Sequence, residues 1–404
     1  MKCPCDKRTV SPVLFLLLLA AVNGAAEETS EAEMFDNPAT EGEAEGLGGG
    51  LNVDVGDAAF AGNPAQSLFD KWPDDLVVAP IPGLSPQLGW TLALAGGYFL
   101  TPKDPDTDIP PSVLGGYGFI AENGSYIYGA GVKLNLLDDK LRVTAGGGYA
   151  DVRYRYYGRS REEGDLGIDV DVLQDGPAYF VKARWRLVSR FYAGVSYLGG
   201  RVDTRLRLGL EAPPGQFFDP TLSLDVGAIS IPLEIDSRDH EQFPRSGWLW
   251  KADARFYRDS FGSDFETETF KISANHYLPM RENDALATRF VFRATGDDAP
   301  FFILSTFGGS TDLRGYPGGR YRDRMMYALQ SEYRWQVNER WVLTGFAGFG
   351  EVASTASDFG DDFLPAAGIG ARFVISQKHR VSLSADIAVG DDGTEFYFGV
   401  GEAF

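Results

Sequence analysis

The sequence predicts an all-β fold, a transmembrane antiparallel β-barrel of about sixteen strands, and three observations lead to it. From about residue 88 to Phe404, apolar and polar residues alternate with a period of two, which is the period of a strand with two different faces. After residue 26 there is no apolar run of the roughly 20 residues that a membrane-spanning helix needs. The 49 glycines, 28 phenylalanines and 18 tyrosines suit tight turns and aromatic girdles.

The alternation also predicts which residues face the membrane. Around Trp185, the apolar residues Tyr179, Val181, Ala183, Trp185 and Leu187 alternate with Lys182, Arg184 and Arg186. The segments 248–256 and 381–389 alternate in the same way, with Asp386 among the polar residues of the second. On a helix these charges would lie around the whole circumference, whereas on a strand they occupy one face. Apolar residues outside and charges inside describe a barrel with a lipid-facing exterior and a polar lumen.

Fifteen segments have the pattern of strands. Because bacterial single-chain barrels have an even number of strands, we expect a sixteenth, near Leu76–Pro80 or at Leu166–Leu173. The break in the alternation at Gly227 predicts a β-bulge. The fifteen segments are 88–99, 113–121, 126–137, 140–157, 178–187, 190–207, 221–236, 247–257, 265–277, 285–296, 324–335, 340–350, 363–374, 380–389 and 395–404.

The region before the barrel divides into three segments. Residues 1–26 have a charged start, a short apolar middle and a small-residue end, which predicts a signal peptide cleaved after Gly24 or Ala26. Residues 27–67 are acidic, rich in glycine and alanine, and expected to be disordered. They are a solvated tail or a segment that recruits a periplasmic partner. Residues 68–87 lead into the barrel, which we expect to occupy residues 88–404.

Cysteine content and charge exclude several classes of function. Cys3 and Cys5 lie in the predicted signal peptide, so the mature chain is expected to have no disulfide, thiolate metal site or cysteine nucleophile. The formal net charge of −20 argues against nucleic-acid binding, which requires basic patches. A barrel with a lipid-facing exterior is instead expected to contact outer-membrane lipid and lipopolysaccharide.

Candidate catalytic and metal motifs are weak. His240, His276 and His379 share no metal-type spacing, and His240 and His379 are expected in turns. No Gly-x-Ser-x-Gly motif is present in the sequence. The acidic run 104–108 lacks the glycine and final glutamate of a calcium loop. We therefore expect no catalytic residues, no metal site, no cofactor and no enzymatic activity.

Three segments between residues 225 and 404 are similar to the BamA/TamA superfamily of outer-membrane barrels, also called the bacterial surface antigen family. The first resembles the family's mid-barrel turn, the second is the stretch 308–316 (GGSTDLRGY), and the third is the run of strands ending in FYFGVGEAF. The matching residues of the turn are Asp236, Arg238, Asp239, Phe243, Pro244 and Gly247. Those of the C-terminal recognition signal are Phe396, Phe398 and Phe404.

The resemblance implies a role for the stretch 308–316. In this family the sixth extracellular loop folds into the lumen, and its arginine pairs with acidic groups on the next two strands. The loop core matches Leu313, Arg314, Gly315 and Tyr316 here, and the alternation directs Glu332 inward as one acidic partner. At the matching place on the following strand stands Gly348, with Glu351 three residues on as a candidate replacement.

The resemblance also implies a function and a location. Family members with transport or insertase activity carry periplasmic polypeptide-transport-associated domains, whereas the residues before this barrel fit none, so the chain resembles the short branch of the family. We expect a barrel in the outer membrane of a Gram-negative bacterium that aids insertion or export of proteins or lipids. Its clients would be unfolded barrel proteins or lipids. The alternative is a passive channel or structural surface antigen, with a lumen lined by cations such as Lys182, Arg184, Arg186, Arg289 and Arg293.

Overall fold

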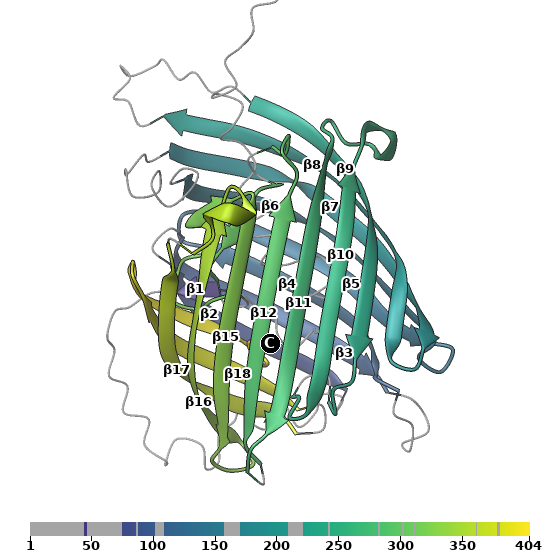
Figure 1. Ribbon diagram of the computed structural model, residues 1–404, viewed down its shortest axis with the longest axis vertical. Helices are drawn as coiled ribbons and strands as arrows, with labels where there is room; N and C mark the ends of the chain where they lie inside the picture. Colours follow the sequence, from purple (N-terminus) through teal and green to yellow (C-terminus); the bar gives the residue numbers. More distant parts are fainter. Residues whose placement is uncertain are drawn as a thin grey trace, which may run out of the picture.

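The computed structural model forms a nearly closed barrel of sixteen antiparallel strands (Figure 1). It describes residues 44–46, 75–85, 88–101, 109–156, 170–208, 221–240, 243–281, 283–300, 303–309, 312–360, 362–377 and 380–404. The predicted signal peptide and most of the predicted acidic segment lie outside these ranges. No helix in the described part of the chain has the length and apolar character needed to cross a membrane.

The barrel strands are β2 to β12 and β15 to β19, and consecutive strands pair along the chain. Their bounds are β2 Leu76–Ser85, β3 Gly89–Leu100, β4 Ser112–Ala121, β5 Tyr126–Leu136, β6 Leu141–Tyr156, β7 Val170–Val188, β8 Phe191–Leu208, β9 Thr221–Asp236, β10 Gly247–Tyr257, β11 Thr267–Pro279, β12 Ala285–Thr295, β15 Met325–Gln336, β16 Trp341–Ala353, β17 Leu364–Ser376, β18 Val381–Gly390 and β19 Gly393–Val400.

The barrel closes where β19 lies next to β2, which we call the seam. The described residues give no residue-by-residue register between these two strands. A three-residue strand, β1 (Ala44–Gly46), instead pairs with β19 at 396–398. The seam strands are short, with 8 residues in β19 and 10 in β2, against 19 in β7 on the far wall.

The two ends of the barrel differ in their connections. At one end, short turns such as 137–140 and 337–340 join the strands, while the other end carries longer connections such as 296–324. In outer-membrane barrels short turns are periplasmic and long loops extracellular. The 296–324 connection is therefore the sixth extracellular loop counted from β2. By the same count, β2 begins and β19 ends at the periplasmic end of the barrel.

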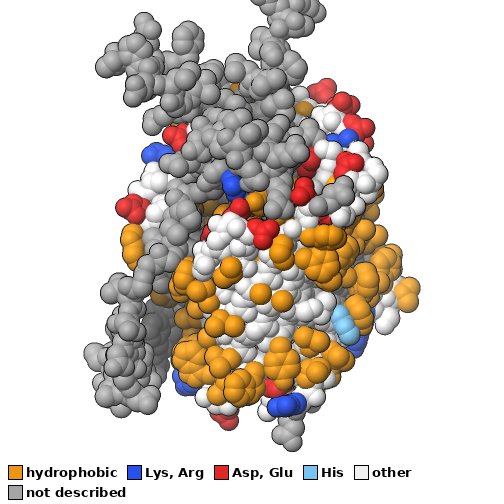
Figure 2. Space-filling view, turned by 60° about the vertical axis from the view of Figure 1, so that its left-hand side comes forward, with side chains coloured by type: hydrophobic (Ala, Val, Ile, Leu, Met, Phe, Trp, Pro, Cys, Tyr) orange, Lys and Arg blue, Asp and Glu red, His pale blue; other side chains and the backbone are white. Residues whose placement is uncertain are grey.

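The outer and inner faces follow the predicted inside-out pattern. Trp185 on β7 and Trp335 on β15 are 46% and 52% exposed, whereas Lys182 and Arg184 on the opposite face of β7 are 5% and 3% exposed. Figure 2 shows hydrophobic side chains as a broad band across the barrel, with charged side chains gathered above and below it. Because this band faces lipid, the polar face of each strand lies toward the lumen.

β2 confirms the sixteenth strand expected near Leu76–Pro80, so the sheet begins before residue 88. Three other expectations about strands need correction. β7 begins at Val170 rather than at residue 178. β19 ends at Val400 rather than Phe404, because the chain leaves the sheet at Gly401, whose φ is 92°. Gly227 is in register rather than bulged. A Cβ there would collide with the carbonyl oxygen of Phe261, so glycine makes room for a loop.

Candidate functional site

The sixth loop, residues 296–324, carries its own small hairpin and apolar core. The hairpin pairs β13 (Ser305–Phe307) with β14 (Tyr321–Asp323). Leu313 and Tyr316 from the apex between them are 1% and 0% exposed. The residues packed with them in one buried cluster are Val291, Phe307, Tyr321, Met326, Ala328, Leu364 and Ala366, from the loop and from β12, β15 and β17. The loop therefore packs against the barrel wall.

Gly315 allows the loop apex to approach the wall closely. Its φ is 122°, in the region that favours glycine. A Cβ at this position would lie 2.7 Å from the Cβ of Ala366 and 3.2 Å from the carbonyl oxygen of Val389. A larger residue would push the neighbouring Arg314 away from the strands.

Arg314 is completely buried and contacts the polar face of two strands. Its Nη2 lies 2.7 Å from Oε2 of Glu332 on β15, and its Nη1 lies 2.7 Å from Oδ2 of Asp386 on β18. Nε donates to Oε1 of Gln330 at 2.8 Å. The guanidinium carbon also lies 3.5 Å from the centre of the Phe346 ring. Carboxylates on two strands and an aromatic face thus surround one cation from the loop.

Further charges extend this contact into a network that we call the loop cluster: Arg314, Glu332, Arg334, Arg372, Asp386 and Glu402. Arg372 on β17 donates to Oδ1 of Asp386 at 2.5 Å and lies 3.3 Å from Oε2 of Glu332. Nε of Arg334 lies 2.8 Å from Glu332 and 3.3 Å from Glu402. The cluster holds three arginines and three carboxylates, so its formal charges cancel, as buried ions require.

A tyrosine joins the loop directly to the seam. The hydroxyl of Tyr397 on β19 accepts a hydrogen bond from the backbone N–H of Gly315 at 2.8 Å. The same hydroxyl donates to the carbonyl oxygen of Tyr316 at 3.1 Å. The last strand of the barrel and the loop apex are therefore in contact through one side chain.

The structure brings Arg314 and Glu332 together, as the family resemblance implied. The second carboxylate is Asp386 rather than Glu351, which instead accepts hydrogen bonds from the backbone N–H groups of Gly360 and Asp362. The alternation had already directed Asp386 inward. The family resemblance implied an acidic partner on the strand directly after that of Glu332, whereas the guanidinium contacts Asp386 on β18.

The C-terminal residues have two different positions. Phe396 and Phe398 lie on β19, as expected. Beyond Gly401 the chain turns inward, so that Glu402 is 3% exposed and the carbonyl oxygen of Phe404 accepts a hydrogen bond from Nη2 of Arg334 at 2.7 Å. Because β19 ends at Val400 and not at Phe404, Glu402 lies outside the strand and joins the loop cluster.

The mid-barrel turn has an ordered set of contacts. Nε and Nη2 of Arg238 each donate to the carboxylate of Asp236 at 3.0 Å. Oδ1 of Asp239 accepts the N–H groups of Arg245 and Ser246. In the same turn, Phe243 is 6% exposed, Pro244 accepts a hydrogen bond from Arg334 at 3.4 Å, and Gly247 has a φ of 102°. This turn is therefore fixed by its own residues and tied to β15.

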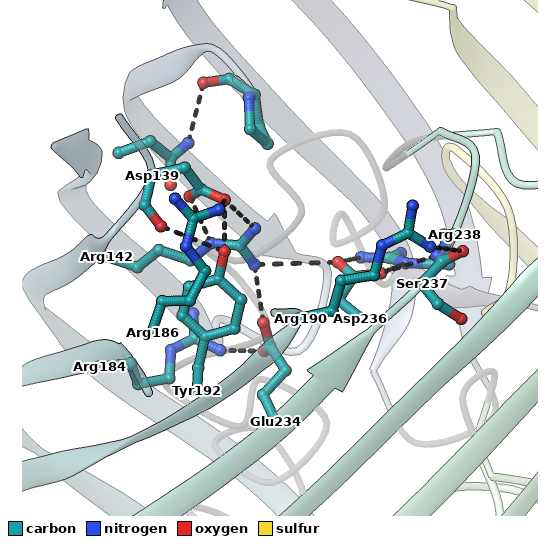
Figure 3. A network of polar contacts seen from close by, with 12 residues as sticks. Asp139, Arg142, Arg184, Arg186, Arg190, Tyr192, Glu234, Asp236, Ser237 and Arg238 are labelled. Carbon is teal, nitrogen blue, oxygen red and sulfur yellow. Dashed lines mark hydrogen bonds and ion pairs between the residues drawn. The ribbon is translucent and has the colours of Figure 1, made fainter. Parts of the chain in front are cut away.

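A second buried network, the wall cluster, lies near the periplasmic turns (Figure 3). Arg142 on β6 donates to Oδ1 of Asp139 at 2.7 Å and to Oε1 of Glu234 on β9 at 2.8 Å. Arg184 on β7 also pairs with Glu234, and the hydroxyl of Tyr192 on β8 donates to Asp139. Members of the wall cluster are Asp139, Arg142, Arg184, Tyr192, Glu234 and Asp236.

These pairs alter the expected lining of the lumen. Arg184 is neutralised by Glu234, and Arg293 pairs with Asp312 of the sixth loop at 2.6 Å. The Nη2 of Arg186 donates to the carbonyl oxygen of Asp138. At least three of the five predicted lumen cations are thus engaged with acceptors on the protein.

The histidines have structural surroundings. Nδ1 of His240 accepts the backbone N–H of Phe243 at 3.1 Å within the mid-barrel turn. The His276 ring stacks on Trp248 with 3.9 Å between ring centres. His379 and the acidic run 104–108 lie outside the described residues.

Comparison with known proteins now supplies a family. Residues 221–404, which include the mid-barrel turn and the whole loop cluster, match the Omp85 superfamily domain. The chain carries an Omp85 superfamily barrel domain. Omp85 domains are non-enzymatic barrels of the outer membrane of Gram-negative bacteria, and this places the chain in that membrane. No curated protein matches the sequence.

Solved structures share the fold of this chain. BamA from Haemophilus ducreyi lacking POTRA domains 1–3 has 15% identity and a TM-score of 0.53, covering 94% of this chain and 78% of that one. CdiB from Escherichia coli has 12% identity and a TM-score of 0.55, covering 93% and 70%. CdiB from Acinetobacter baumannii has 10% identity and a TM-score of 0.52, covering 81% and 59%. At these identities, the similarity concerns the fold.

Proposed function

We propose that this Omp85 barrel aids the insertion or export of client molecules at the outer membrane, with the sixth loop as a plug in its lumen. The observation that carries the proposal is the complete burial of Arg314 between Glu332 and Asp386. The strands of the wall are held by their own backbone hydrogen bonds, so the wall does not require a buried cation from a loop. An arginine held by carboxylates from two strands keeps the loop in one defined position.

The seam supports a route for a client. β2 contains Pro80 and Pro82, and proline within a sheet is confined to edge strands, bulges or strand ends because it has no N–H to donate. β19 has only 8 residues and is followed by Gly401. Residues 396–398 of β19 pair with the short strand β1. The edge of β19 therefore accepts an added segment, as exposed strand edges do.

The engaged lumen cations argue against the passive anion channel. Arg184 and Arg293 would have to attract anions from solution, yet each pairs with a carboxylate of the protein. A strand edge at the seam would accept an extended or amphipathic client. Unfolded barrel proteins and lipids both belong to this class. A periplasmic partner recruited by the acidic segment 27–67 and lipopolysaccharide around the barrel remain part of the proposal.

The test is the folding rate of a small unfolded outer-membrane barrel added to liposomes. Liposomes containing the native protein should accelerate folding relative to empty liposomes. Arg314→Ala should reduce that acceleration. The matched control is Arg320→Ala, because Arg320 lies in the same loop but makes a partly exposed pair with Asp392 at 3.3 Å. Native protein that gives the rate of empty liposomes would contradict protein insertion.

A further inference from the structure

A groove lies on the outer face of the barrel at its periplasmic rim. It has a volume of about 630 Å³ and is lined by Met280, Arg281, Asp284, Tyr333 and Trp335. Met280, Arg281 and Asp284 belong to the short turn between β11 and β12, and Tyr333 and Trp335 belong to the last turn-proximal part of β15. Met280 and Trp335 are 51% and 52% exposed, so the groove opens toward the headgroup region of the inner leaflet.

A missing side chain on the next strand widens this surface. Gly345 on β16 pairs directly with Tyr333 and lies on the same outward face as Leu343, which is 41% exposed. A Cβ at Gly345 would have no atom within 4 Å. The lipid-facing wall thus has an open depression beside Tyr333, where an alternating strand ordinarily carries an apolar side chain.

The groove is lined by two side chains of opposite charge, Arg281 and Asp284. Among the described residues, neither Arg281 nor Asp284 forms a salt bridge, although the charge of Arg245 in the mid-barrel turn acts on the buried Asp284. The Asp284 carboxylate accepts hydrogen bonds from the Tyr333 hydroxyl at 2.7 Å and from the Gln336 backbone N–H at 3.1 Å, both uncharged donors. The Asp284 carboxylate therefore lines the same groove as the Arg281 guanidinium and the exposed Trp335 indole.

We propose that this groove binds the headgroup of a zwitterionic phospholipid that has a primary ammonium, as in phosphatidylethanolamine. Arg281 contacts the phosphate, because a guanidinium matches phosphate geometry. Asp284 receives the ammonium, and Met280 and Trp335 contact the start of the acyl chains, since aromatic side chains favour the interface between headgroups and hydrocarbon. The separation of the two charges within one groove distinguishes this headgroup from an anionic one.

Native mass spectrometry of the full chain in detergent tests the proposal with three lipids of identical acyl chains: phosphatidylethanolamine, phosphatidylglycerol and phosphatidylcholine. The native protein should retain phosphatidylethanolamine most. Arg281→Ala should reduce retention of all three by roughly two- to fivefold, the range of one partly exposed ion pair. Asp284→Asn should remove only the preference for phosphatidylethanolamine, because the asparagine oxygen still accepts from Tyr333.

A variant that fills the depression gives a test without a change of charge. Gly345→Leu should lower retention of every lipid, whereas Gly118→Leu should not. Gly118 is the matched control because a Cβ there also has nothing within 4 Å and it lies on an outward face, between the exposed Leu114 and Ile120. The heat-dependent shift in gel mobility confirms that each variant is folded. Equal retention of the three lipids by native protein, or retention unchanged in Gly345→Leu and Arg281→Ala, would overturn the proposal.

Discussion

The loop cluster and the wall cluster use the same kinds of side chain to hold different kinds of structure. In the loop cluster, Arg314 comes from a long loop and Glu402 from the chain terminus, and both meet strands far away in sequence. In the wall cluster, Arg142, Arg184 and Glu234 come from strands that are close neighbours in the sheet. Buried ion pairs therefore position a separate segment in the first case and fasten strand to strand in the second.

The comparison predicts that damage to the two clusters has different consequences. Breaking a buried pair by removing one partner costs about 3–5 kcal/mol wherever the pair is. In the loop cluster this cost changes the position of the loop, because the wall keeps all its backbone hydrogen bonds. In the wall cluster the same loss lowers the free energy of unfolding of the barrel itself.

Arg314→Ala should have the largest effect on transport of ions. About 3–5 kcal/mol lost from the held position is enough to shift the loop population by a hundredfold or more, since 1.4 kcal/mol corresponds to tenfold. The expected result in planar lipid bilayers is a raised conductance with normal folding. Arg320→Ala should leave conductance at the native level. A conductance unchanged by Arg314→Ala would contradict the placement of this loop as a plug.

Glu234→Gln should produce the opposite pattern. The substitution leaves the guanidinium groups of Arg142 and Arg184 buried without their shared carboxylate. We expect a loss of about 3–5 kcal/mol in the free energy of unfolding, measured as a lower temperature for loss of the compact band on gels, with native conductance. Glu268→Gln is the control, because its pair with Arg258 is 42% and 33% exposed and contributes little. A raised conductance in Glu234→Gln would remove the distinction between the clusters.

Tyr397→Phe should have an intermediate effect that links loop and seam. It removes the hydroxyl that bonds both Gly315 and Tyr316 and leaves the ring in place. The held position of the loop should lose about 1 kcal/mol of stability. We expect brief conductance openings, with a frequency between that of native protein and that of Arg314→Ala. If the loop and the seam are coupled, the same variant also raises crosslinking of a cysteine placed on the β19 edge with an added peptide strand. Openings without that rise would limit Tyr397 to a role in the loop.

Sequence periodicity predicted most of the wall because lipid and lumen impose opposite demands on successive residues. The bounds of β9 and β10 agree with the prediction to the residue. β2 was expected only as one of two candidates for the sixteenth strand, because Pro80 and Pro82 interrupt the pattern of a strand. The proline positions are explained only when the strand is known to lie at the seam, which is a property of the closed barrel and not of the local sequence.

The candidate site was predictable only where a motif accompanied the alternation. Arg314 and Glu332 followed from the family resemblance and from the inward face of one strand. Asp386 and Arg372 are inward by the same alternation, but their meeting depends on how far the loop reaches across the barrel. Glu402 required the turn at Gly401, which one positive φ angle decides.

The smallest expected effect is a pH dependence in the wall cluster. Burial raises the pKa of the Asp139 carboxyl, but hydrogen bonds and charge from Arg142 outweigh it, so that the pKa lies below its ordinary value of 3.8. A group with a lowered pKa in the folded state stabilises it above the unfolded pKa and loses that contribution as the pH falls through the folded pKa.

Asp139→Asn should therefore be less stable than native protein at pH 7, and the difference should shrink as the pH falls below about 4. The measurement is the temperature at which the compact gel band disappears, taken across that range. Asp225→Asn is the control, because the pair of Asp225 with Arg201 is 46% and 56% exposed and should contribute little at any pH. Because the loop cluster contains no residue of the turn 137–140, in which Asp139 lies, conductance should stay constant in both variants. A conductance that follows the titration would mean that the two clusters are coupled through the wall.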